Sequence, residues 1–222
     1  MASHLDLEEQ EQLDQLKAFW KRWGNLITWL LTAVLAVFAA WQGWQWRERN
    51  QAAEAAAMYG EFDRLLAAQD LDKAAAAAGD LKARFPSTGF AAQAGLQVAK
   101  LQLEKGKADD AKASLSWVAD QGSEPPYRDL ARLRLAGLQL DAKAFDDAIK
   151  TLDAIKSPEF ASLVADRRGD ALLLQDKRDA AKAEYQKALA GLEKTQDYRR
   201  VIEAKLATLG VPTVVETAGA AQ

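Results

Sequence analysis

Four short segments of the sequence share one pattern of polar and apolar positions. Three read GKADDAKASL at 106–115, KAFDDAIKTL at 143–152 and DKRDAAKAEY at 176–185, and a weaker copy, QDLDKAAAAA, lies at 69–78. Superposing the copies aligns an alanine at spacings of 37, 37 and 33 residues: Ala74, Ala111, Ala148 and Ala181. A period of this length is typical of stacked pairs of antiparallel helices.

Each copy predicts a helix that follows a short polar turn. Further core positions come four and seven residues after the aligned alanine, which puts all three on one helix face. The positions are Ala78, Leu115, Leu152 and Tyr185 in the first set, and Leu81, Val118, Ile155 and Ala188 in the second. A partner helix is expected before each turn, with a small residue where the two helices cross, at Ala99, Ala136 and Gly169. The pattern therefore predicts an all-α fold, an α-solenoid of about four helix pairs, closed by a last helix at 197–208.

A long apolar segment precedes the repeats. Residues 23–46 carry no charged side chain, and as a helix they would be about 36 Å long, enough to span a hydrocarbon core of about 30 Å. Tryptophans at both ends are expected to be membrane-interface anchors: Trp20, Trp23, Trp41, Trp44 and Trp46. Two other interpretations are a buried core helix of a soluble protein and a cleavable signal peptide, cut near Val37 and Ala39.

The charges beside this segment favour a cytoplasmic N-terminus by a small margin. Three basic residues precede it and two follow it: Lys17, Lys21 and Arg22, then Arg47 and Arg49. Apolar residues at helical spacing before the segment, from Leu13 to Trp23, predict an amphipathic helix. This helix is interpreted as an interfacial flank of the span or as a cytoplasmic contact site.

Composition excludes several kinds of chemistry. The 222 residues include 29 basic and 32 acidic side chains, with a net charge of −3 and no long basic run, so we expect no nucleic-acid partner. Cysteine is absent and His4 is the single histidine, so thiolate or multi-histidine metal sites, a cysteine nucleophile and a histidine-based triad are excluded. No phosphate-binding loop or nucleophile–base pair is visible. We therefore predict no catalytic residues, no metal, no cofactor and no enzyme activity.

Two short motifs suggest chemistry but fit structural roles better. Asp146 and Asp147 could form a catalytic or metal-binding pair, yet a similar pair recurs at 109–110, at the start of a predicted helix. Carboxylates there complement the positive end of the helix dipole. Arg168-Gly169-Asp170 spells an adhesion tripeptide, but Gly169 occupies the predicted helix-crossing position, so a helical role is expected.

The repeat resembles the tetratricopeptide repeat. The residues that match its pattern best lie in the last copy: Gly169, Leu172, Ala181, Tyr185 and Ala188. The first copy departs from it, because Phe62 stands where a small residue is usual. Two of the periods are 37 residues, whereas the family repeats every 34. Some irregular helix packing is therefore expected.

The whole chain resembles the bacterial YfgM family, the ancillary SecYEG translocon subunits, most closely over 149–185. The resemblance implies a single-pass inner-membrane protein with a cytoplasmic N-terminus and a periplasmic C-terminal domain. It also implies association with the Sec translocon (SecYEG) and with a periplasmic chaperone of the PpiD type, and unfolded client proteins are a further candidate partner. The domains would be a cytoplasmic flank at 1–22, the span at 23–46, the stem and repeats at 47–209, and a flexible tail at 210–222.

The function expected from this organisation is that of a membrane-tethered, protein-binding scaffold that assists translocated proteins. In tetratricopeptide geometry the first helix of each pair lines a concave face. The candidate partner-binding residues on that face are Leu96, Lys100, Leu103, Leu133, Gly137, Leu140, Asp166, Asp170 and Leu173. The alternative is a scaffold for another envelope assembly, such as a division, cell-wall or secretion complex.

Overall fold

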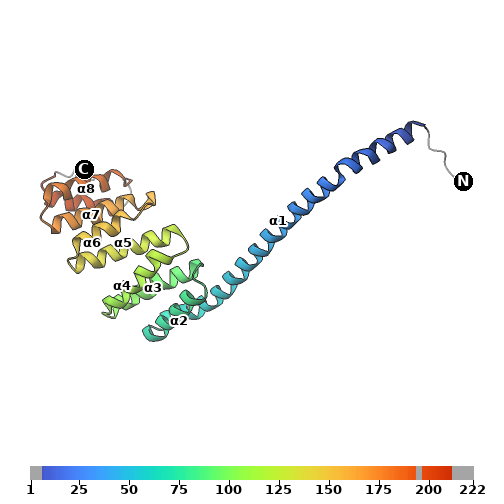
Figure 1. The fold of residues 1–222 in the computed structure, drawn as a ribbon. Helices are drawn as coiled ribbons and strands as arrows, with labels where there is room; N and C mark the ends of the chain where they lie inside the picture. The colour runs from blue at the N-terminus through green and yellow to red at the C-terminus, as the bar shows by residue number, and fades with distance from the viewer. Residues whose placement is uncertain (1–6, 194–196, 212–222) are drawn as a thin grey trace, which may run out of the picture. The chain divides into compact units, whose positions relative to one another are not determined.

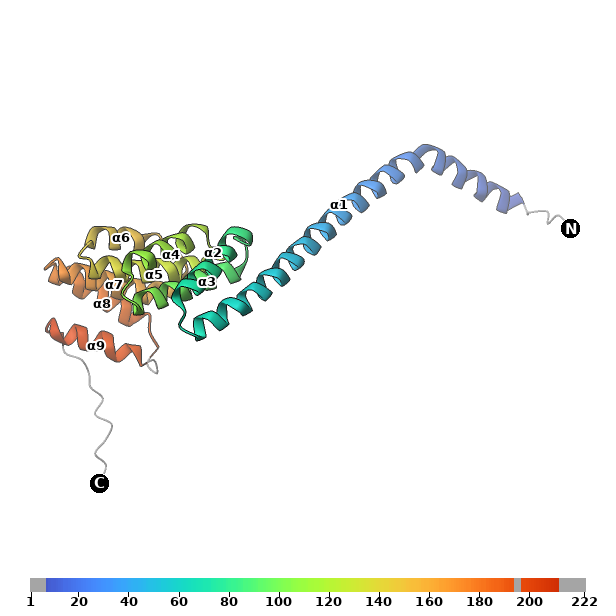
Figure 2. The same ribbon diagram turned by 90° about the horizontal axis from the view of Figure 1, so that it is seen from below.

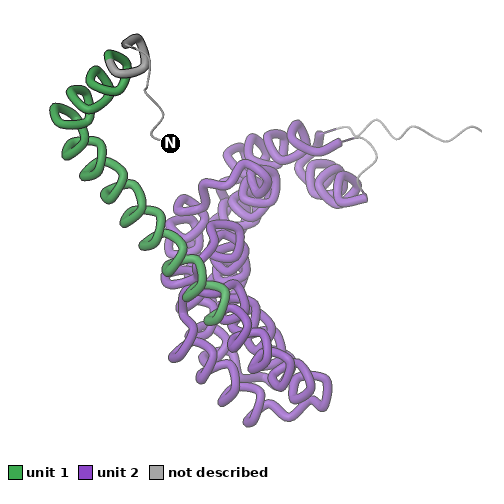
Figure 3. Tube along the Cα trace, turned by 90° about the vertical axis from the view of Figure 1, so that its right-hand side faces the viewer, with its two compact units in different colours: residues 1–51 green, residues 52–222 purple. Residues whose placement is uncertain are grey.

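The computed structural model describes residues 7–193 and 197–211, and these residues form helices and no strand. The chain divides into two compact units between Gln51 and Ala52, inside the first helix (Figure 3). The predicted tail lies outside the described residues apart from Gly210 and Val211, and so does His4.

The first unit contains most of α1 (Leu7–Ala67). Among the described residues, α1 is the one helix long and apolar enough to cross a membrane, and its most apolar stretch has a mean hydropathy of 1.7 with 6% of its residues buried. Thr28 and Thr32 donate their hydroxyl hydrogens to the carbonyl oxygens four residues earlier, both at 2.8 Å, so these polar groups are satisfied without water. Because its side chains are exposed, this stretch is not the buried core helix of a soluble protein.

The second unit is a stack of antiparallel helix pairs followed by a single helix (Figures 1 and 2). The end of α1 precedes α2 (Leu71–Arg84), and the later elements are α3 (Gly89–Glu104) with α4 (Ala108–Gln121), α5 (Pro125–Asp141) with α6 (Phe145–Asp153), the 3-10 helix η1 (Pro158–Phe160), α7 (Ala161–Leu174) with α8 (Arg178–Ala190), and α9 (Tyr198–Thr208). The predicted all-α fold, with one long apolar helix and about four helix pairs, is confirmed.

The turn between the two helices of each pair has the same backbone conformation in all four copies. One residue adopts a positive φ, at Gln69, Gly106, Lys143 and Asp176, with values between 58° and 76°. The amide of the following residue donates to a carbonyl five positions earlier, as from Lys107 to Gln102 at 2.8 Å. This bond satisfies a carbonyl that the end of the helix leaves free.

The aligned positions form the core. All four recurring alanines are fully buried, and the residues four positions later are at most 1% exposed. The helix-crossing residues Ala99, Ala136 and Gly169 are buried as well. Phe62 fills the same place in the first pair at 0% exposure, and the axes of that pair approach less closely than those of the later pairs. The predicted irregular packing is found there.

One predicted core residue, Ile155, is only half-buried. The prediction is confirmed only in part: α6 ends at Asp153, so Ile155 lies beyond the helix, but its side chain still packs against the cluster that contains Ala148 and Leu152. The segment after α6 is held by Asp129 of α5, whose carboxylate accepts hydrogen bonds from the amides of Lys156 (3.2 Å) and Ser157 (3.0 Å) and from the Ser157 hydroxyl (2.6 Å).

Asp129 is also linked to the helix before it, through Arg132 of its own helix. Its other carboxylate oxygen lies 2.8 Å from Nη1 of Arg132, and Nη2 of Arg132 donates to the carbonyl of Ala119 at the end of α4. Burial by itself would raise the pKa of Asp129, but the hydrogen bonds from Ser157, Arg132 and Lys156 outweigh it and hold that pKa below its ordinary value. This buried carboxylate therefore joins α5 to the segment after α6 and, through Arg132, to the end of α4.

The two suggestive motifs have the structural roles expected of them. Asp146 and Asp147 lie exposed in the first turn of α6, as Asp109 and Asp110 do in α4. Gly169, in the adhesion-like tripeptide, is buried within α7 against the ring of Tyr185.

Replacing Gly169 by alanine should lower the free energy of unfolding by about 1–3 kcal/mol. An added Cβ would lie 2.5 Å from Cε1 of Tyr185, a fully buried ring. Gly137→Ala, in α5, is the matched control, because an added Cβ there has no neighbour within 4 Å, and it should raise stability by up to about 1 kcal/mol. Urea unfolding of both variants provides the comparison, and equal midpoints would contradict the close contact at Gly169.

Asp129→Asn should make stability less sensitive to pH between about 5 and 3. The folded-state pKa of Asp129 is depressed, so the folded protein binds fewer protons there than the unfolded chain. The contribution is complete above the unfolded pKa of 3.8 and is lost as pH falls through the folded pKa. Urea midpoints measured across this range should fall further for the native chain than for the variant, and parallel curves would rule out this role.

Candidate partner-binding face

The first helices of successive pairs adjoin one another along the stack. α3 contacts α5, and α5 contacts α7, while Figure 3 shows the pairs of this unit following a curved path. Polar side chains connect the neighbouring helices: the Gln93 amide donates to the Tyr127 hydroxyl at 2.5 Å, and Arg134 donates to the carbonyl of Leu96 at 3.1 Å. These contacts fix the spacing of the helices that carry the predicted partner-binding residues.

Five of the predicted residues are exposed or half-exposed: Lys100, Leu103, Leu133, Gly137 and Leu173. Leu103 is 38% exposed, which is unusual for a large apolar side chain in this unit. Lys100 lies 3.8 Å from Glu104, and both side chains are well solvated, so this ion pair contributes little to stability. These five residues have surface that a partner could contact.

The other four predicted residues face the interior of the chain. Leu96 and Leu140 are 5% and 8% exposed and belong to hydrophobic clusters shared with the second helices. Asp166 is 0% exposed, and the side chain of Asp170 is 19% exposed. They are turned inward because a first helix packs against its own second helix, its neighbouring pair and, for α7, against α9.

The two aspartates of α7 anchor α9. Nζ of Lys205 lies 2.7 Å from a carboxylate oxygen of Asp166 and 2.7 Å from one of Asp170. The Tyr198 hydroxyl donates to Asp166 at 2.5 Å, and the Tyr185 hydroxyl donates to Asp170 at 2.8 Å. Burial raises the pKa of both phenols well above the ordinary value, and the hydrogen bonds to the aspartates add to this, so both remain donors. The carboxylates of Asp166 and Asp170 thus have their hydrogen-bond and ion-pair partners within the chain.

The sequence analysis missed several polar residues of this face. Gln93, Gln97, Tyr127 and Arg134 are half-buried or exposed and lie beside the predicted positions. Gln97 donates to the Tyr59 hydroxyl at 2.6 Å, which connects α3 to the end of α1. Helical spacing is the signal that could have found the two glutamines, since Gln93 and Gln97 are four residues apart and Gln97 precedes Lys100 by three.

The exposed part of the candidate face has a mixed character. It combines aliphatic side chains with amides, phenols and isolated charges, which suits contact with a polypeptide. No cluster of three or more His, Cys, Asp or Glu side chains that could hold a metal ion occurs within residues 7–193 and 197–211.

The predicted interface tryptophans lie on the surface of α1. Their exposed fractions are 60% for Trp20, 45% for Trp23, 55% for Trp41, 70% for Trp44 and 66% for Trp46. Trp20 folds back over Gly24, where an added Cβ would lie 3.1 Å from the indole nitrogen. The set is therefore free to meet lipid headgroups on both sides of the apolar stretch.

A long apolar helix followed by stacked helix pairs defines a class: repeat proteins of the tetratricopeptide type with a single candidate membrane span. The family described as tetratricopeptide repeat-like domain matches residues 17–211, which is most of the chain and includes the apolar helix.

Curated relatives narrow this class. An ancillary SecYEG translocon subunit of Neisseria gonorrhoeae is 30% identical over 210 residues, covering 94% of this chain and 100% of the relative. Proteins with the same name from Haemophilus influenzae and Escherichia coli are 28% identical over 184 residues and 34% identical over 97 residues. They cover 82% and 44% of this chain and 89% and 47% of the relatives. The chain belongs to this tetratricopeptide repeat-like family of ancillary SecYEG translocon subunits, which confirms the resemblance found in the sequence.

Proposed function

We propose that this protein is a membrane-tethered, protein-binding scaffold that associates with the Sec translocon and assists the handling of translocated proteins. The observation that carries the proposal is the full-length match to a relative named as an ancillary SecYEG translocon subunit. The apolar part of α1 supports it, because a translocon subunit must be held at the membrane.

In the proposed mechanism the protein acts by holding its repeat unit at the membrane rather than by catalysing a reaction. A span that anchors the repeat unit beside the translocon raises its effective concentration there, so contacts that are weak in solution become effective. The exposed residues of the partner-binding face, Lys100, Leu103, Leu133, Gly137 and Leu173, are the positions proposed to meet a partner. Leu96, Leu140, Asp166 and Asp170 would support this face from within.

The finer assignment concerns orientation and partners. We propose a cytoplasmic N-terminus and a periplasmic repeat unit, in keeping with the small excess of basic residues before the span. A membrane-anchored periplasmic chaperone and unfolded clients are the partners proposed for the repeat unit. The interfacial tryptophans would fix the depth of the helix in the bilayer.

Crosslinking in intact membranes, followed by gentle solubilisation, affinity purification and mass spectrometry, tests the association. SecYEG subunits and a periplasmic chaperone should be enriched with the native chain. Leu103→Glu should reduce recovery of the chaperone several-fold, because a buried unpaired carboxylate disfavours an apolar contact. Ala113→Glu, at an exposed position of α4, is the matched control. Enrichment of division, cell-wall or secretion proteins without SecYEG would contradict the proposal and favour a scaffold for another envelope assembly.

Orientation can be tested with single cysteines, because the native chain contains none. Gln15→Cys reports on the segment before the span and Ala113→Cys on the repeat unit, and both positions are exposed. In intact cells a maleimide that does not cross the inner membrane should label the cysteine at 113 only. After permeabilisation both should react, and labelling of position 15 alone in intact cells would reverse the proposed topology.

A further inference from the structure

The sequence of the last helix, α9, resembles that of the first part of α5. Tyr198–Thr208 reads YRRVIEAKLAT, and the segment 71 residues earlier, 127–137, reads YRDLARLRLAG. The alignment pairs the two tyrosines and pairs a basic residue, Arg134, with Lys205. It also pairs Ala136, a helix-crossing residue, with Ala207.

The structure gives both helices the same packing on the preceding pair. Ala131 and Leu135 of α5 are buried in a cluster with residues of α4. Their counterparts Ile202 and Leu206 are buried in a cluster with residues of α8.

The polar contacts correspond as well. Arg134 binds the carbonyl of Leu96 on α3, and Lys205 binds Asp166, the residue of α7 at the same register. α9 therefore takes the place of the first helix of a fifth pair.

The side of α9 that faces away from α8 is exposed, whereas the equivalent side of α5 is covered by α6. Ala136 is fully buried and clusters with Ala148 and Leu152 of α6, its second helix. Ala207 is exposed, and so is Ala204, whose counterpart Leu133 packs on the same cluster. Within residues 7–193 and 197–211 no helix covers this side of α9.

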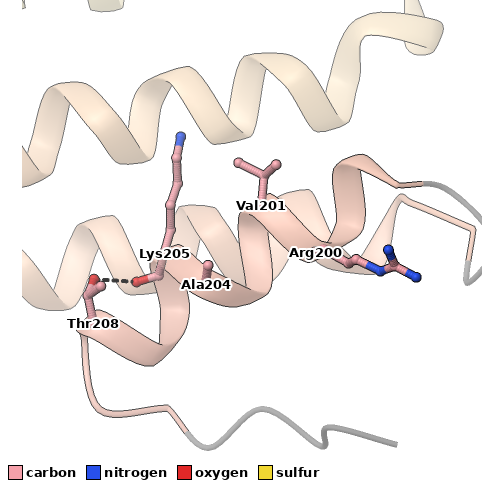
Figure 4. A pocket seen from close by; sticks show the side chains of 5 residues that line it. All are labelled: Arg200, Val201, Ala204, Lys205 and Thr208. Carbon is pink, nitrogen blue, oxygen red and sulfur yellow. Dashed lines mark hydrogen bonds between the residues drawn. The ribbon is translucent and has the colours of Figure 1, made fainter. Parts of the chain in front are cut away.

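We call this surface the end face, and it consists of Arg200, Val201, Ala204, Ala207 and Thr208. A hollow of about 510 Å³ lies over Arg200, Val201, Ala204, Lys205 and Thr208 (Figure 4). Val201 is 45% exposed and, with Leu103 and Leu174, is one of three large apolar side chains so exposed in the described part of the second unit. The surface is thus a shallow apolar strip with the exposed guanidinium of Arg200 at its border, because the Lys205 ammonium is held by Asp166 and Asp170.

The charges of the end face favour an acidic partner. The Arg200 side chain is 85% exposed and lies 3.8 Å from Asp197, itself 97% exposed, so this pair contributes little and leaves the guanidinium available. A partner helix that carries a carboxylate at this point would complement the Arg200 guanidinium.

We propose that the end face docks an amphipathic helix of a partner protein in the place that a second helix occupies in the earlier pairs. The partner helix runs antiparallel to α9, with apolar side chains over Ala204 and Ala207 and a carboxylate opposite Arg200. Small residues at the crossing let the two backbones approach closely, as Ala99 and Ala136 do within the chain. The inference does not depend on which assembly supplies the partner.

A photo-crosslinking amino acid at position 204 or at position 207 of the full chain, in native membranes, tests this inference. Ala113, an exposed alanine of α4, is the control position. Both end-face positions should crosslink to one protein, and the attached peptides should map to residues three or four apart on one helix. Crosslinks to residues 212–222 of the same chain, to a second copy, to scattered partner residues, or none above the control would overturn it.

Charge reversal provides a second readout. Arg200→Glu should lower the crosslinking yield from position 207 about tenfold, whereas Lys187→Glu, at an exposed cation of α8, should leave it unchanged. Equal yields from the two variants would overturn the carboxylate contact. Recovery of SecYEG with the native chain, without end-face crosslinks, would reject this inference and retain the proposed function.

Discussion

The repeat unit depends on one constraint, the close approach of two helix backbones at a small residue in three of its four pairs. Ala99, Ala136 and Gly169 are buried, and at Gly169 even a methyl group would lie 2.5 Å from the facing ring. Since no long side chain separates the backbones, the large residue of the second helix can rest directly on the first helix. These contacts recur along the chain, so helices of 9 to 17 residues build a continuous core.

The two ends of the array differ in the residue at the helix-crossing position and in what packs on it. At the first end Phe62 takes the crossing position, and its ring fills the space between axes that stand farther apart. At the last end Ala207 keeps the small residue but has no second helix over it in the described chain. α9 is nevertheless held on α7, because Lys205 and Tyr198 bind the fully buried carboxylate of Asp166. The last helix therefore covers the preceding pair, as predicted, but leaves its own outer side, at Ala204 and Ala207, exposed.

The sequence predicted the repeat and its register well, because both follow from local periodicity. An alanine with apolar residues four and seven positions later identifies a buried helix face without knowledge of the neighbours. Features that depend on distant residues were less predictable. The end of α6 before Ile155 follows the hydrogen bonds of Asp129 to a loop 27 and 28 residues away. The burial of Asp166 reflects Lys205, 39 residues later, so neither could be read from local spacing.

The same reasoning explains why the candidate face was predicted only in part. Helical register places Leu96, Leu133 and Asp166 in equivalent positions, yet their exposure differs because each helix meets a different neighbour. Leu133 stays half-exposed, whereas Asp166 is covered by α9. The candidate partner-binding face and the proposed end face each present only a few exposed side chains on any one helix. Two weak surfaces on one tethered array can act together, since occupation of the first raises the local concentration of the second. For the proposed scaffold this gives a basis for selectivity, because a partner that reaches both surfaces would be retained longer than one that reaches a single surface.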